Sequence, residues 1–65
     1  MNVVINGETK TTASKNLAEL LMEQNYTGGT IATAINGVFV AKTDREQTPL
    51  TDNCSVEIVA PVQGG

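Results

Sequence analysis

The sequence ends in two glycines, Gly64 and Gly65, and this pair is the feature best suited to chemistry. A glycine pair has no Cβ atoms, so it can enter a narrow channel and bring its carboxylate to the active site of another protein. The pair follows Pro61, which cannot donate a ladder hydrogen bond and should end strand pairing. We therefore expect residues 62–65 to form a flexible tail in which Gly65 carries the reactive carboxylate, and Gly64 and Gln63 thread into the partner.

The other side chains offer little for catalysis. The chain has no His, and Cys54 with scattered carboxylates is too small a ligand set for a zinc site. Gly28-Gly29 is too short for a phosphate-binding loop and is interpreted as a helix stop and turn. Neither a cation nor a helix N-terminus adjoins Cys54 in sequence to stabilise a thiolate, so we expect a structural or incidental role for it. We expect no enzyme activity, and no cofactor or metal bound by the chain itself.

The composition is that of a small, weakly acidic globular domain. A length of 65 residues allows one domain, so we expect residues 1–65 to form a single unit. The formal net charge is −3 and the four cationic residues are scattered, which disfavours nucleic-acid binding. A single cysteine allows no internal disulfide, and neither a membrane span nor a signal peptide is visible. These features predict a cytoplasmic protein that does not enter a membrane.

Two Asn-Gly pairs, Asn6-Gly7 and Asn36-Gly37, indicate two β-hairpins. Both residue types tolerate positive φ, which the common two-residue hairpin turn requires. Each pair separates two short runs, and a further alternating run precedes Pro61. The sequence therefore predicts five strands, over residues 1–5, 8–12, 30–35, 38–40 and 55–59.

Between the hairpins, Leu17, Leu20 and Leu21 form a stripe with helical spacing. Ser14 or Asn16 can cap the start of this helix, and residues 25–29 end it. One helix lying across one face of a mixed sheet is the simplest way to bury a single leucine stripe. The predicted fold is therefore α+β, a β-grasp (ubiquitin-like) sheet of about five strands with one helix across one face. The expected core contains Val3, Ile5, Leu17, Leu20, Leu21, Ile35, Val56 and Ile58, with residues 43–49 as a surface connection.

Several short motifs follow one another along the chain. They are Ile5-Asn6-Gly7-Glu8, Leu17 to Leu21, Ala34-Ile35-Asn36-Gly37, Val40, Lys42, Leu50-Thr51-Asp52, Val56-Glu57-Ile58-Val59 and Gly64-Gly65. In order, spacing and total length this series resembles the ThiS family, the sulfur carriers of thiamin thiazole biosynthesis. The chain departs from the usual family pattern at Ala41, Lys42 and Arg45, where Pro, Arg and Trp are common, and at Gln63, where Gly is frequent.

The resemblance implies a sulfur carrier acted on by partner enzymes. An E1-like adenylyltransferase (ThiF-like) would use ATP to adenylate the Gly65 carboxylate. Sulfur from a cysteine desulfurase or another donor would convert the acyl adenylate to a thiocarboxylate, and a thiazole synthase (ThiG-like) would receive that sulfur. Partner docking is expected on the outward sheet face near the C-terminus, with Val59 and Val62 as contacts and Phe39 as a further candidate.

Three other interpretations remain open from the residues. The nearest is a MoaD-like sulfur carrier, the small subunit of molybdopterin synthase, with the same glycine terminus. Another is a ubiquitin-like modifier that is attached to lysines through Gly65. The last is a plain binding module whose terminal glycines have no function.

Overall fold

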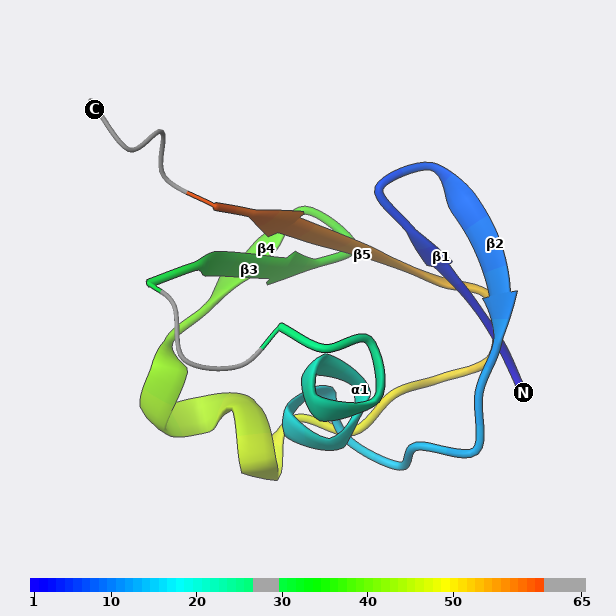
Figure 1. Ribbon diagram of the computed structural model, residues 1–65, viewed down its shortest axis with the longest axis horizontal. Helices are drawn as coiled ribbons and strands as arrows, with labels where there is room; N and C mark the ends of the chain where they lie inside the picture. Colours follow the sequence, from blue (N-terminus) through cyan, green and yellow to red (C-terminus); the bar gives the residue numbers. More distant parts are fainter. Residues whose placement is uncertain (27–29, 61–65) are drawn as a thin grey trace.

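The computed structural model describes residues 1–26 and 30–60, which form a five-stranded mixed sheet with an α-helix and a 3-10 helix beside it (Figure 1). The strand order is β2-β1-β5-β3-β4, with β1 and β5 parallel and all other neighbours antiparallel. This confirms the expected β-grasp arrangement. In chain order the elements are β1 (Asn2–Ile5), β2 (Glu8–Thr11), α1 (Leu17–Glu23), β3 (Ala32–Ile35), β4 (Val38–Val40), the 3-10 helix η1 (Lys42–Gln47) and β5 (Cys54–Val59).

Both expected hairpin turns are present. Asn6 and Gly7 have φ values of 49° and 84°, and Asn36 and Gly37 have values of 50° and 83°. Positive φ at both central residues defines the turn type whose twist matches that of paired strands. The two hairpins are not neighbours in the sheet, because β5 lies between β1 and β3 and joins them.

The helix α1 begins at an Asn cap. The Asn16 side-chain oxygen accepts a hydrogen bond from the backbone N–H of Glu19 at 2.8 Å, and the Glu19 carboxylate accepts one from the Lys15 N–H at 2.8 Å. This reciprocal pair satisfies backbone donors that the helix start leaves free. Ser14, the other candidate cap, is buried and donates to the carboxylate of Glu23 instead.

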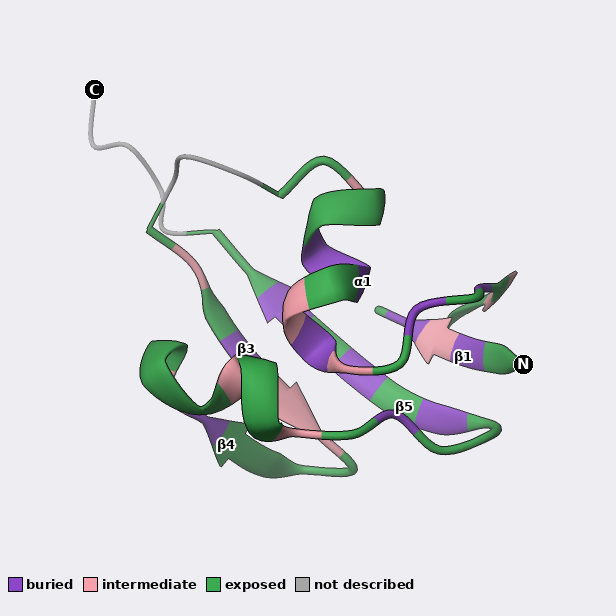
Figure 2. Ribbon diagram, turned by 90° about the horizontal axis from the view of Figure 1, so that it is seen from below, coloured by how far each residue is buried: buried purple, intermediate pink, exposed green. Residues whose placement is uncertain are grey.

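The core lies between α1 and the inner face of the sheet (Figure 2). The leucine stripe of α1 is buried there, and β5 alternates between buried and exposed residues along its whole length. The expected core residues are buried except Ile35, which is half-buried and packs against the core at the hairpin end, opposite the exposed Val38. The expectation also missed Val40, Leu50 and Cys54, which are buried.

The segment after β4 is more regular than expected. Residues 43–49 lie on the surface, as predicted, but most of them belong to η1, which contacts α1. The Thr48 hydroxyl donates to the Asp44 carbonyl at 2.6 Å and closes the last turn of η1. The polar segment has no apolar periodicity, so the sequence carried no signal for this helix. No helix within residues 1–26 and 30–60 is long and apolar enough to cross a membrane.

Candidate functional site

The outer face of the sheet, opposite the core, carries an apolar surface at its β5 end. Ala32 lies opposite Val59, and Ala34 lies opposite both Phe39 and Glu57, so these residues share one face. Val59 is 61% exposed and Phe39 is 70% exposed. We call Ala32, Ala34, Phe39 and Val59 the outer patch. Both described residues that were predicted as docking contacts, Val59 and Phe39, therefore lie on one continuous surface.

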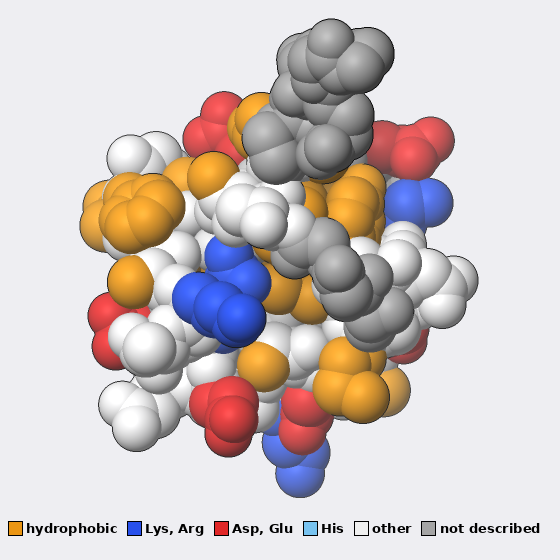
Figure 3. Space-filling model, turned by 60° about the vertical axis from the view of Figure 1, so that its left-hand side comes forward, with side chains coloured by type: hydrophobic (Ala, Val, Ile, Leu, Met, Phe, Trp, Pro, Cys, Tyr) orange, Lys and Arg blue, Asp and Glu red, His pale blue; other side chains and the backbone are white. Residues whose placement is uncertain are grey.

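The small side chains in β3 give the outer patch its shape. Alanines at positions 32 and 34 leave a shallow hollow of about 170 Å³ bounded by Phe39, Glu57 and Val59. Large exposed apolar side chains that gather on one surface usually mark an interaction site. Figure 3 shows hydrophobic side chains on this side of the molecule around a cluster of Lys and Arg side chains.

The strand that carries Val59 is held by both hairpin turns. On one side the Asn6 amide donates to the Ile58 carbonyl at 3.1 Å, and its oxygen accepts from the Ile58 N–H at 2.9 Å. On the other side the Asn36 side chain accepts from the Ser55 N–H at 2.9 Å. Sequence reasoning assigned the two Asn residues to turns alone and missed these contacts. The available signal was the presence of Asn in both turns, because its side-chain amide can both donate and accept hydrogen bonds.

The terminal residues predicted to carry the chemistry lie outside the described residues. These are Val62, Gln63, Gly64 and Gly65, together with the predicted flexibility of the tail. The described chain reaches Ala60, one residue beyond Val59 of the outer patch. The segment that leads to Gly65 therefore starts beside this patch.

Cys54 opens β5 and faces the core. Its residue is 3% exposed, and it lies opposite Val3 in the parallel β1–β5 ladder. This position agrees with the structural role expected for it. In the part of the chain that the structure describes, no three His, Cys, Asp or Glu side chains lie close enough to hold a metal ion.

The sequence and the fold were both compared with those of known proteins. The model of the ThiS family matches residues 3–65. Among solved structures, the thiamine biosynthesis protein (ThiS) from Geobacter metallireducens is 25% identical and superposes with a TM-score of 0.84, over 100% of both chains. No curated protein matches the chain.

Proposed function

The chain belongs to the ThiS family of small sulfur carriers of thiamine biosynthesis, and we propose that it carries sulfur as a thiocarboxylate on Gly65. The observation that carries this proposal is the family match through residue 65, which includes Gly64-Gly65, on a fold shared over its full length with a ThiS protein. The same match favours thiamine biosynthesis over the molybdopterin pathway. The chain is a carrier and not a catalyst, so its chemistry is performed by partner enzymes.

The proposed chemistry begins with the poor reactivity of a carboxylate. An oxygen of the Gly65 carboxylate attacks the α-phosphorus of ATP, and pyrophosphate leaves. A sulfur nucleophile at the oxidation level of sulfide then attacks the acyl carbon, and AMP leaves with the carboxylate oxygen. Covalent activation divides one difficult substitution into two easier steps. The activating enzyme binds the ATP. A cysteine desulfurase or another donor supplies the sulfur, and where it arrives as a persulfide, a thiol reductant releases it as sulfide and is oxidised to a disulfide.

The proposed partners are an E1-like activating enzyme and a thiazole synthase. The outer patch supports docking, because Val59 and Phe39 expose large apolar side chains and Val59 precedes residues 62–65 closely in the chain. Val62 belongs to the same proposal as a contact in the tail. Docking on the sheet face would leave the glycines free to extend into the active site, where Gly64 and Gln63 thread the channel.

The experiment that tests the proposal is intact-mass spectrometry of the carrier. The purified chain is incubated with ATP, its activating enzyme and a sulfur source, and fragmentation locates any change. We expect the mass increase of an oxygen-to-sulfur exchange, confined to Gly65 and dependent on ATP. An unchanged mass, or sulfur located on Cys54, would contradict the proposal. Isopeptide conjugates to lysines in place of the thiocarboxylate would indicate a protein modifier.

A further inference from the structure

A second hollow lies beside the outer patch, between β3 and η1. It has a volume of about 290 Å³ and is lined by Thr30, Ile31, Ala32, Phe39, Lys42 and Arg45. We call it the basic cleft. It shares Ala32 and Phe39 with the outer patch, so the two surfaces are continuous. Its walls combine apolar side chains with two cationic ones, a combination that suits an acidic side chain with an apolar neighbour.

Arg45 is fixed in this cleft by neutral acceptors. Its Nε donates to the Thr33 hydroxyl at 3.1 Å, and one terminal nitrogen donates to the Ile31 carbonyl at 2.8 Å. Thr33 is itself held, because its hydroxyl donates to the Val40 carbonyl at 2.8 Å. A guanidinium has five N–H donors in a rigid fork, so further donors remain for a ligand. The half-buried Arg45 is therefore oriented before any partner arrives.

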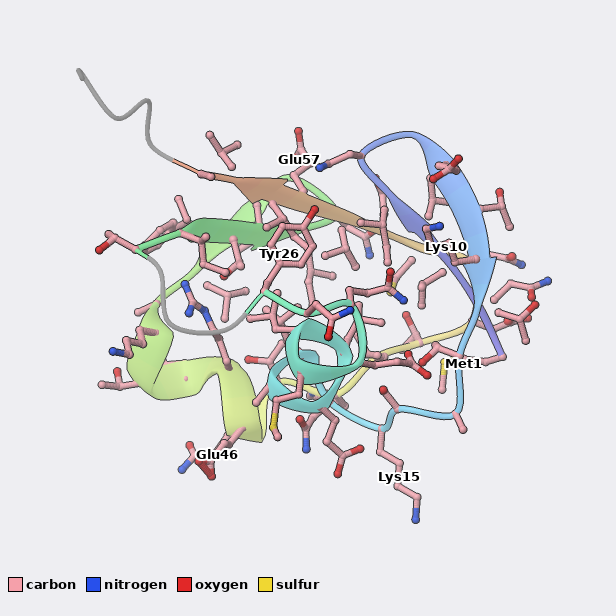
Figure 4. The ribbon with its side chains drawn as sticks, viewed as in Figure 1. Met1, Lys10, Lys15, Tyr26, Glu46 and Glu57 are labelled. Atoms are coloured by element: carbon pink, nitrogen blue, oxygen red, sulfur yellow. The ribbon has the colours of Figure 1, made fainter. Side chains whose placement is uncertain are left out.

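Lys42 lies on the same side of η1 as Arg45. The two residues are three positions apart, and side chains at that spacing eclipse one another in a 3-10 helix. The acidic residues of η1, Asp44 and Glu46, fall at other positions of the turn. Figure 4 shows the Glu46 side chain pointing away from the sheet. The geometry of η1 thus separates its cations from its carboxylates.

The positive charge of the cleft is not neutralised by the described part of the chain. Within residues 1–26 and 30–60 the one ion pair joins Lys10 and Glu8, at 3.2 Å. The formal net charge of the whole chain is −3, so the chain as a whole repels an acidic segment. A partner carboxylate would therefore be attracted here and opposed elsewhere, which would set the orientation of the two proteins.

We propose that the basic cleft binds an acidic segment of the activating enzyme. A Glu or Asp side chain of that segment is held by Arg45 and Lys42, while an adjacent apolar side chain covers Ile31 and Phe39. The inference rests on the proposed function and extends it, because it names the charge that fixes the carrier's orientation. The outer patch supplies apolar contact area, and the basic cleft fixes the orientation of the carrier on the enzyme.

The test is a titration of the activating enzyme with the full chain, at low and at high ionic strength. Lys42→Glu is compared with the matched control Lys15→Glu, which changes the net charge equally. Lys42 and Lys15 are both exposed, so both variants should fold. Lys15 precedes α1, and it is not among the residues that line the basic cleft (Figure 4). We expect Lys42→Glu to weaken binding about tenfold at low salt, with a smaller loss at high salt. Lys15→Glu should stay within about twofold of the wild type.

The possible results separate the two proposals. Equal affinities of Lys42→Glu and Lys15→Glu, with the wild type bound and thiocarboxylated, would overturn the cleft proposal and leave the carrier function standing. The cleft proposal would also be overturned if Lys42→Glu bound normally but raised the KM for ATP, because the anion would then be a nucleotide phosphate. Failure of the wild type to bind the enzyme and to gain sulfur would overturn both.

Discussion

Asn6 and Ile58, which are far apart in sequence, are joined by hydrogen bonds in both directions, from a side chain in the first hairpin turn to the backbone of the last strand. These bonds continue the pairing of β1 with β5 beyond Ile5 and Val56, the last residues of that ladder. They hold β5 next to the point where the outer patch begins. A turn residue therefore also fixes the strand that leads to Gly65.

The first prediction concerns this contact. Asn6→Gly keeps a residue that tolerates positive φ but removes both side-chain bonds, so the free energy of unfolding should fall by about 1–3 kcal/mol. Asn36→Gly is the matched control, because it makes the same change in the other turn and removes one side-chain bond to β5. Urea unfolding of both variants measures the difference. Equal stability of the two variants would show that the two bonds from Asn6 to Ile58 contribute no more than the single bond from Asn36 to Ser55.

The second prediction concerns the core. Leu21 is 5% exposed, so Leu21→Ala should lower the free energy of unfolding by about 2–5 kcal/mol. Met22→Ala is the control on the same helix, where the side chain is 69% exposed and the cost should stay within about 0.5 kcal/mol. Chemical denaturation followed by circular dichroism gives both values. Similar losses of unfolding free energy for the two variants would show that α1 does not pack on the sheet through the side that carries Leu21.

The third prediction concerns docking through the outer patch. Val59→Asp should weaken binding of the activating enzyme by about tenfold or more, because it places a charge where apolar surface must be buried. Val38→Asp is the matched control. Val38 is similarly exposed but lies opposite Ile35, away from the outer patch. Titration calorimetry measures the affinities. Unchanged binding of Val59→Asp would exclude the patch as the docking surface.

The fourth prediction concerns the terminal carboxylate. Deletion of Gly65 should abolish the acyl adenylate and the thiocarboxylate, and one residue appended after Gly65 should do the same, because both changes displace the carboxylate from the nucleotide. Gly64→Val should impair activation, because a β-branched side chain crowds a channel shaped for bare backbone. The melting temperature should hardly change, because the described core is formed by residues up to Ile58.

The control for this fourth prediction is Cys54→Ala, which removes the one thiol of the chain and keeps a small apolar residue in the core. It should still gain sulfur. Intact-mass spectrometry after incubation with ATP, the activating enzyme and a sulfur source reads out every variant. Sulfur gained by the Gly65 deletion, or lost in folded Cys54→Ala, would move the chemistry away from the terminus.

Strong local signals made most of the fold predictable. Each Asn-Gly pair specifies a hairpin turn, and the spacing of Leu17, Leu20 and Leu21 specifies which side of α1 is buried. The alternation along residues 54–59 likewise separates the core face from the outer face. From these elements the sequence also predicted that Val59 faces outward.

The parts that could not be predicted depend on contacts between distant segments. The basic cleft exists because Arg45 bonds to Ile31 and Thr33, and no pattern in the sequence links those positions. The bonds from Asn6 to Ile58 depend in the same way on β1 and β5 being neighbours. Sequence patterns describe single elements, whereas these side chains acquire their roles when the sheet is assembled.

The central position of β5 has a consequence for synthesis of the protein on the ribosome. The other four strands are made first, but they form two separate hairpins, and an isolated two-stranded hairpin is marginally stable in water. Until residues 54–59 emerge, β1 and β3 each expose an unpaired edge that can join another chain. A prematurely terminated product would therefore stay unfolded and open to proteolysis. Only a chain translated through β5 would persist, so the folded pool is selected for chains synthesised almost to Gly65.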